Sequence, residues 1–212
     1  MANGRQWANA IVLPNGHVLV TGGSRFGENG GGDAVLAAET WNPATGTWTV
    51  RASAAIFRGY HSTAVLLPNG AVFTAGGGVP GPVTNFNAEI YYPPYFFTAQ
   101  NGGSILTKRP TIISLSTNQA TYGQQIQVQL GVGDVAYTVS FIALPSTTHS
   151  FDPNMRRMTL TFQRNANGTI TVTMPSSANL APPGYYYLSV VNEAGAPSLA
   201  VIIAMNAVAP PR

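Results

Sequence analysis

The sequence contains no cysteine, and only 8% of its 212 residues are charged. The absence of cysteine excludes disulfide bonds, thiolate zinc sites and cysteine nucleophiles. The low charge is combined with a hydrophobic fraction of 45%, whereas a disordered chain has the opposite composition. The chain therefore has enough apolar surface to fold as one or two domains.

Clusters of basic residues and long apolar runs are also missing. Apart from Lys108-Arg109 and Arg156-Arg157, the ten basic residues are scattered singly, so no basic stripe is available to neutralise phosphates. The apolar runs fall far short of the roughly 18 residues that indicate a membrane span. No charged segment followed by an apolar one opens the chain as a signal peptide would. Neither nucleic acid nor a membrane span is expected.

Glycine and proline, by contrast, are abundant. The 23 glycines and 16 prolines favour many turns over long helices. This composition predicts an all-β protein.

An internal repeat organises the first half of the chain. Residues 11–23 (IVLPNGHVLVTGG) are echoed by residues 65–77 (VLLPNGAVFTAGG), and Glu39–Pro43 is echoed by Glu89–Pro93. Each copy predicts two strands around a tight Asn-Gly hairpin with positive φ angles, then a third strand with an aromatic residue. A period of about 50 residues with a double glycine is typical of kelch repeats, each of which forms one β-propeller blade.

The repeat predicts about two blades, whereas a propeller closes with about 4–8. The chain is therefore expected to be the C-terminal piece of a longer protein, or to dock onto blades that another chain supplies.

From Lys108 the pattern changes to short alternating runs separated by turn residues. These predict a second domain, an immunoglobulin-like sandwich. We expect domains at residues 1–107 and 108–212. The seven predicted strands of the sandwich are Thr111–Leu115, Gln125–Leu130, Ala136–Leu144, Met158–Phe162, Thr169–Thr173, Tyr185–Val191 and Leu199–Ala204.

The three histidines are the candidate metal ligands. His17 lies where the second copy has Ala71, which indicates a surface or packing role. His61 follows Tyr60 at the head of a predicted strand, where the two side chains share a ligand only across a bend, because neighbours on a regular strand face opposite sides. His149 lies in the polar loop 146–154. Taken singly, these residues are better explained by ordinary hydrogen bonds or by a solvated loop than by a metal site. Together, phenolate and imidazole suit copper(II).

Motifs along the whole chain resemble the galactose oxidase and glyoxal oxidase family of copper-radical oxidases. The resemblance covers the last propeller blades and the C-terminal, early-set sandwich, in order. The residues that carry it are Arg58–Ser62, Leu67–Gly70, Gly76–Gly78, Asn87–Tyr95, Arg109-Pro110, Thr148–Ser150, Arg156-Arg157, Pro183–Tyr186 and Asn192–Ser198.

The resemblance implies a seven-bladed kelch propeller that holds one copper ion, with a loop of the sandwich delivering a histidine. By position, Tyr60 resembles the axial tyrosine that acts as the base, and His61 and His149 resemble two copper ligands. The family oxidises primary alcohols or aldehydes and reduces O₂ to H₂O₂, in secreted enzymes. Its radical cofactor is a tyrosine cross-linked to a cysteine, which this chain does not encode, so the chain alone is expected to be inactive.

Two other functional interpretations also fit the sequence. The same scaffold also suits a non-catalytic carbohydrate- or surface-binding module that uses exposed aromatic residues around Tyr91–Phe97, or a structural remnant. If the chain belongs to an oxidase, the expected partners are the missing blades and a small alcohol, aldehyde or carbohydrate substrate. Phe26 and Glu28, on the loop after Gly22-Gly23, are weak candidates for contact with that substrate.

Overall fold

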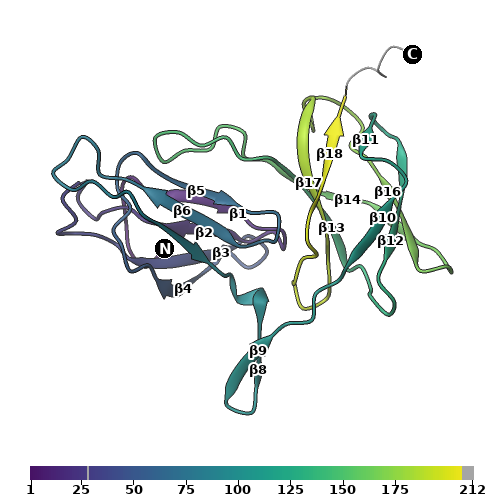
Figure 1. The fold of residues 1–212 in the computed structure, drawn as a ribbon, viewed down its shortest axis with the longest axis horizontal. Helices are drawn as coiled ribbons and strands as arrows, with labels where there is room; N and C mark the ends of the chain where they lie inside the picture. The colour runs from purple at the N-terminus through teal and green to yellow at the C-terminus, as the bar shows by residue number, and fades with distance from the viewer. Residues whose placement is uncertain (28, 207–212) are drawn as a thin grey trace. The chain divides into compact units, whose positions relative to one another are not determined.

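The computed structural model describes residues 1–27 and 29–206, and it is all-β, as the composition predicts (Figure 1). The chain divides into two compact units. Residues 1–67, 71–93 and 145–155 form the first, and the other described residues form the second. The domain boundary between residues 107 and 108 stays a prediction. Within the described ranges, no helix is long and apolar enough to cross a membrane.

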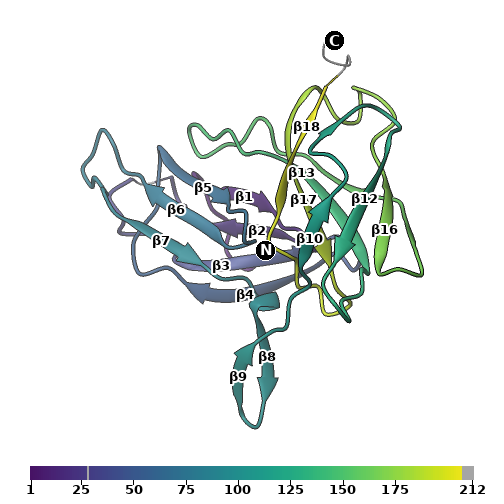
Figure 2. The same cartoon turned by 45° about the vertical axis from the view of Figure 1, so that its right-hand side comes forward.

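The first unit contains two antiparallel sheets in which neighbours in the sequence pair with each other (Figure 2). Alternating burial along the strand at Ser62–Leu66 shows that one face of the second sheet is packed, as a half-buried strand requires. The four-stranded sheet is β1 (Asn9–Val12), β2 (Val18–Thr21), β3 (Ala37–Asn42) and β4 (Thr47–Ser53), and the three-stranded sheet is β5 (Ser62–Leu66), β6 (Val72–Gly76) and β7 (Ala88–Tyr91).

The Asn-Gly hairpins differ in detail from the prediction. Positive φ occurs at Gly16 (90°) and Gly70 (86°) but not at the asparagine before each of them. In the first hairpin, the Leu13 N–H donates to the His17 carbonyl at 2.8 Å, so three residues lie inside the loop. This is the longer hairpin that ends in a left-handed glycine, rather than the two-residue turn with two positive φ angles.

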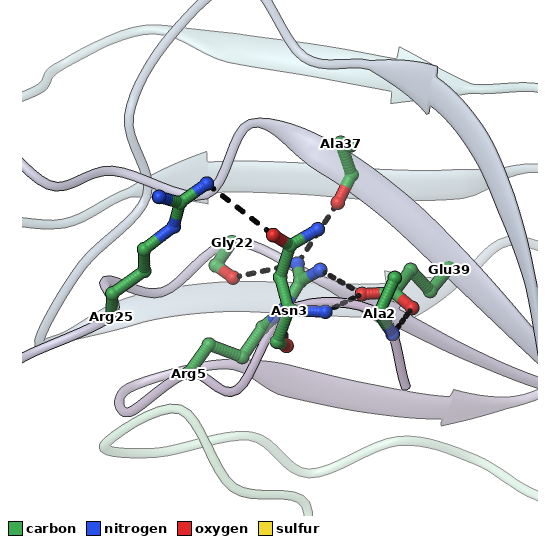
Figure 3. A network of polar contacts seen from close by, with 7 residues as sticks. All are labelled: Ala2, Asn3, Arg5, Gly22, Arg25, Ala37 and Glu39. Atoms are coloured by element: carbon green, nitrogen blue, oxygen red, sulfur yellow. Dashed lines mark hydrogen bonds and ion pairs between the residues drawn. The ribbon is translucent and has the colours of Figure 1, made fainter.

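A buried ion pair ties the N-terminal segment to the first sheet (Figure 3). Nη2 of Arg5 lies 2.6 Å from Oε1 of Glu39 on β3, and neither side chain is exposed to solvent. Nη1 of Arg5 also donates to the carbonyls of Gly22, at 3.2 Å, and Ala37, at 2.9 Å. The N–H of Ala2 donates to the other Glu39 oxygen at 2.5 Å. Each of these hydrogen bonds replaces one that the Arg5 guanidinium or the Glu39 carboxylate would make with water if it were exposed.

The second unit is a sandwich of two sheets, as predicted. Its core includes Phe141, which is fully buried and stacks on Tyr186 at 4.5 Å between ring centroids. One sheet has the order β10 (Ile112–Leu115), β12 (Gln125–Leu130), β16 (Thr169–Thr173), β15 (Phe162–Arg164). The other has the order β11 (Gln119–Ala120), β18 (Val201–Met205), β17 (Gly184–Val191), β13 (Thr138–Ala143), β14 (Arg157–Leu160).

The predicted strand at Met158–Phe162 is wrong as a single element. The chain passes from one sheet to the other at Thr161, so β14 pairs with β13 and β15 pairs with β16. A second difference is a hairpin that we did not predict. It follows a short 3₁₀ turn (Pro94–Phe96) and consists of β8 (Phe97–Gln100) and β9 (Gly103–Leu106).

Candidate metal centre

Tyr60, His61 and His149 come together within the first unit. Tyr60 and His61 directly precede β5, and His149 lies in the loop 145–155, which belongs to the same unit. The ring centroids of Tyr60 and His61 are 3.8 Å apart, those of His61 and His149 4.7 Å, and those of Tyr60 and His149 5.9 Å. Side chains separated by 88 residues in the sequence thus form one cluster.

A bend in the backbone lets two consecutive residues share this cluster. His61 has φ of 63°, in the left-handed region that residues other than glycine rarely adopt. The alternation of a regular strand is interrupted there, and the Tyr60 and His61 rings stack with an interplanar angle of 29°. A left-handed backbone at a residue other than glycine carries a strain energy of about 1–3 kcal/mol, and such residues are found most often at functional sites.

The imidazole of His61 is held by a hydrogen bond on its Nδ1 side. Its Nδ1 lies 3.0 Å from the carbonyl oxygen of Val79. Because a carbonyl oxygen only accepts hydrogen bonds, this contact requires the proton on Nδ1. Nε2 then carries the lone pair, and a second hydrogen bond of this kind is typical of histidine ligands.

His149 occupies the tip of a tight hairpin. The N–H groups of Thr148 and Phe151 each donate to the other residue's carbonyl, at 2.8 and 2.9 Å. Between them, His149 (φ 51°) and Ser150 (φ 61°) are both left-handed, in a turn that normally selects Asn-Gly. Nδ1 of His149 lies 2.6 Å from the Thr148 hydroxyl. The ring is therefore anchored on its Nδ1 side, as the ring of His61 is.

Hydrogen bonds between hydroxyl groups connect the loop 145–155, which carries His149, to the beginning of β5. The Thr147 and Thr63 hydroxyls form a short hydrogen bond. The Ser150 hydroxyl contacts that of Ser62 at 3.4 Å and the carbonyl of Gly59 at 3.5 Å. Both contacts fall on residues next to Tyr60 and His61, so the loop is fixed beside the two side chains that it meets.

The segment before Tyr60 is held by a second arginine. Nη1 of Arg58 donates to the carbonyls of Gly76, at 3.1 Å, and Asn87, at 3.0 Å. Nη2 lies 3.2 Å from Oε2 of Glu89, whose other oxygen accepts the N–H of Ala55 at 2.8 Å. This arrangement repeats that of Arg5 and its carboxylate in the first sheet.

Asn29 and the small size of Gly59 position Tyr60. Oδ1 of Asn29 accepts the N–H of Tyr60 at 3.1 Å, and its Nδ2 donates to the carbonyl of Gly78 at 2.9 Å. A Cβ atom on Gly59 would lie 2.5 Å from both this Oδ1 and the Phe57 ring. Glycine at position 59 is therefore a packing requirement.

Trp7 is a member of the cluster that sequence analysis missed. Its ring centroid lies 4.7 Å from that of Tyr60, its Nε1 donates to the Gly27 carbonyl at 3.2 Å, and it is 38% exposed. Trp7 also has a left-handed backbone, with φ of 61°. The repeat carries the signal that was available, because Trp7 precedes Pro14 by seven residues, as His61 precedes Pro68.

Three other residues from the sequence analysis, Phe26, Glu28 and His17, lie elsewhere or stay undescribed. Phe26 is 84% exposed on the loop whose Gly27 carbonyl holds the Trp7 indole, and the Phe26 N–H donates to Asp33 at 2.6 Å. Glu28 lies outside the described residues. His17 is partly buried, and burial, with a smaller effect of Arg51, lowers its pKa.

The aromatic stretch Tyr91–Phe97 is partly exposed and partly buried, with Tyr92 and Phe97 48% and 45% exposed. Tyr95 and Phe96 are 6% and 7% exposed. Tyr95 instead donates a short hydrogen bond to the Gly70 carbonyl. These two aromatic residues serve packing.

The donor set of the cluster fits copper. Two imidazoles and a phenol supply nitrogen and oxygen donors, which copper(II) prefers, and three protein ligands leave positions for small molecules. In the part of the chain that the structure describes, no group of three or more His, Cys, Asp or Glu side chains is arranged to hold a metal ion. Tyr60, with the two histidines, therefore makes the best candidate centre.

Comparison with known proteins shows that the chain is similar to galactose oxidase and to an aldehyde oxidase. Residues 109–205 match the family model for the galactose oxidase-like early set domain. The chain is 35% identical to galactose oxidase from Gibberella zeae over 94% of its own length, and 30% identical to aldehyde oxidase GLOX1 from Arabidopsis thaliana over the same share. It spans 29% and 35% of the lengths of these two proteins.

A solved structure of an oxidase is also similar to this chain in fold and sequence. It is described as a fungal alcohol oxidase with catalytic diversity among the AA5 family, in complex with copper, and it covers 95% of this chain with a TM-score of 0.86 and 33% identity. The chain covers 42% of that protein. Residues 109–205 thus match a galactose oxidase-like early set domain, in a chain that is similar over nearly all its length to galactose oxidase and to aldehyde oxidase GLOX1.

Proposed function

We propose that this chain is the copper-binding part of an alcohol or aldehyde oxidase that converts a primary alcohol or aldehyde and O₂ into the oxidised product and H₂O₂. The observation that carries the proposal is the meeting of His61, His149 and Tyr60 on strained backbone, with the Nδ1 atoms of both histidines engaged. The relatives are oxidases of this kind, and one structural neighbour contains copper.

In this proposal His61 and His149 hold copper through Nε2, and Tyr60 completes the set through its phenol oxygen. Copper supplies the one-electron redox chemistry when it is bound. Tyr60 receives the proton of the substrate hydroxyl at its phenol oxygen, a role that a positioned tyrosine can fill. Trp7, exposed beside Tyr60, provides an apolar wall for the substrate.

Oxidation of an alcohol to an aldehyde removes two electrons, and a single copper ion accepts one. The family's second redox equivalent is a tyrosine cross-linked to cysteine, and this sequence has no cysteine. We therefore propose that turnover needs further propeller blades, and that the two sheets of the first unit are kelch blades. The same relationship suggests an extracellular enzyme.

Copper titration followed by electron paramagnetic resonance tests the metal site. We expect one tetragonal copper(II) signal per chain, which His61→Ala and His149→Ala each abolish. His17→Ala is the matched control, because it removes the remaining histidine in the same unit. Copper binding that survives the double substitution His61→Ala/His149→Ala would contradict the proposal. Formation of a protein radical when the copper-loaded chain is oxidised would overturn our account of the missing cofactor.

A further inference from the structure

A cleft of about 720 Å³ opens at one end of the sandwich of the second unit. Four segments line it: the approach to β10, the turn between β12 and β13, the end of β15 and the turn after β17. None of its residues belongs to the candidate metal centre. Its lining includes Lys108, Asp134, Tyr137, Arg164 and Glu193.

Charged groups of both signs line the cleft. Lys108, Arg109 and Arg164 are basic, and Asp134 and Glu193 are acidic. An anion such as phosphate would meet two carboxylates, and a cation would meet three basic groups. The lining therefore favours an uncharged ligand that both donates and accepts hydrogen bonds.

The walls of the cleft are held by their own hydrogen bonds. The side chain of Asp134 is 8% exposed, and its Oδ2 accepts the N–H of Thr111 at 2.8 Å. Nδ2 of Asn192 donates to the Lys108 carbonyl at 3.0 Å, and Nη2 of Arg164 donates to the Ala136 carbonyl at 2.6 Å. A ligand thus meets a preformed surface, which keeps the entropic cost of binding low.

Several groups on this surface remain available to a ligand. Tyr137 is 61% exposed, and Val135 beside it is equally exposed. Among the contacts of residues 1–27 and 29–206, neither the Tyr137 hydroxyl nor the Glu193 carboxylate has a hydrogen-bond partner. The side chain of Lys108 is 82% exposed, and its ammonium lies 3.8 Å from Oδ1 of Asp134. An aromatic face, an acceptor and a donor therefore line the same cleft.

We infer that this cleft is a binding site for a saccharide with a pyranose ring. The apolar C–H face of the ring would stack on Tyr137, and its hydroxyls would donate to Glu193 and accept from Lys108 and Arg164. Aromatic residues with a polar rim are the usual means of orienting such ligands in a pocket. The site is independent of copper and of the proposed oxidase reaction.

Ligand-observed saturation-transfer NMR on the full chain tests the inference, with cellotetraose as the probe. We expect saturation of the pyranose ring protons by the wild-type chain, with or without copper. Tyr137→Ala should weaken binding about tenfold, because it removes the aromatic contact, whereas Tyr137→Phe should retain it. Glu193→Gln, which keeps the shape but loses the charged acceptor, should weaken binding to a smaller extent.

Tyr185→Ala is the matched control. Tyr185 is 63% exposed on β17 of the same unit but does not line the cleft. Cellotetraose binding that is absent in the wild type, unchanged in Tyr137→Ala, or equally reduced in Tyr185→Ala would overturn the inference. Stronger binding of sorbitol, which lacks a ring, or of glutamate, which is charged, would overturn it as well. The experiment does not depend on the metal, so its failure leaves the copper proposal to its own test.

Discussion

Replacement of Glu39 by Gln probes how much the buried ion pair contributes to the first unit. Glu39 and Arg5 are both inaccessible to solvent, so the substitution leaves the guanidinium buried without its counter-charge. Breaking a buried pair in this way costs about 3–5 kcal/mol. The retained amide oxygen still accepts a hydrogen bond, which places the expected loss of unfolding free energy at the lower end, about 3 kcal/mol.

The second sheet offers a matched comparison, because Glu89 pairs with Arg58 in the same way but is 27% exposed. Water reaches its carboxylate and offsets the loss, so Glu89→Gln should cost only about 1 kcal/mol. Glu89→Gln should also weaken copper binding, since Arg58 holds the segment that leads into Tyr60. The two substitutions are chemically identical, and only burial and position differ.

Urea unfolding followed by tryptophan fluorescence measures these losses. All three tryptophans, Trp7, Trp41 and Trp48, belong to the first unit, so the signal reports that unit. Glu39→Gln that destabilises no more than Glu89→Gln would refute the reasoning. Arg5→Met/Glu39→Leu completes the test, because replacing both partners with apolar residues removes the stranded charge and should recover much of the loss.

The same pair sets an acid dependence. Burial alone would raise the pKa of Glu39, but the N–H groups of Ala2 and Asn3 and the Arg5 guanidinium outweigh it and lower the pKa below its ordinary value. A lowered pKa stabilises the folded state above the ordinary value of 4.5, and the contribution is lost as the pH falls through the folded value. The stability of Glu39→Gln should therefore decline less steeply between neutral and acidic pH than that of the wild type.

Two further substitutions test the backbone of the candidate centre. Ser150→Gly should raise stability by about 1 kcal/mol in the same urea assay, because glycine adopts the left-handed conformation without the steric cost, and copper binding should persist because His149 is anchored through Thr148. A loss of stability would show that the hydroxyl contacts of Ser150 outweigh the strain. Gly59→Ala should cost about 1–3 kcal/mol through the clash with the Phe57 ring and lower copper affinity. Unchanged affinity by calorimetry would contradict the positioning role.

The sequence alone predicted most of the fold. Alternating apolar runs and turn residues identified most strands of both units, because each pattern is local. The switch between sheets at Thr161 was not visible, since a strand of one sheet continues directly into a strand of the other. The hairpin at Phe97–Leu106 was readable in principle: Asn101 and Gly102, with φ of 48° and 79°, form the turn that Asn-Gly pairs favour.

The candidate centre was only partly accessible from sequence. Local reasoning treated His61 and His149 as unrelated, because no pattern near either residue indicates the other. The bend at His61 also violates the alternation that sequence analysis assumes, and functional sites often depart from local rules in this way. The family resemblance selected the three side chains, and the geometry brings them together with Trp7, which local patterns did not flag.

The absence of cysteine now separates two properties that the family combines. In our proposal metal binding depends on His61, His149 and Tyr60, all of which lie in the first unit and are held by hydrogen bonds within it. Two-electron chemistry depends on a second redox group, which no residue of this chain supplies in the known form. A chain with the first property and without the second should bind copper stoichiometrically and produce no H₂O₂ from alcohols. If the proposal is right, adding propeller blades that carry the tyrosine and cysteine should restore H₂O₂ production without changing the copper ligands. A passive metal site would bind copper but would gain no activity from those blades.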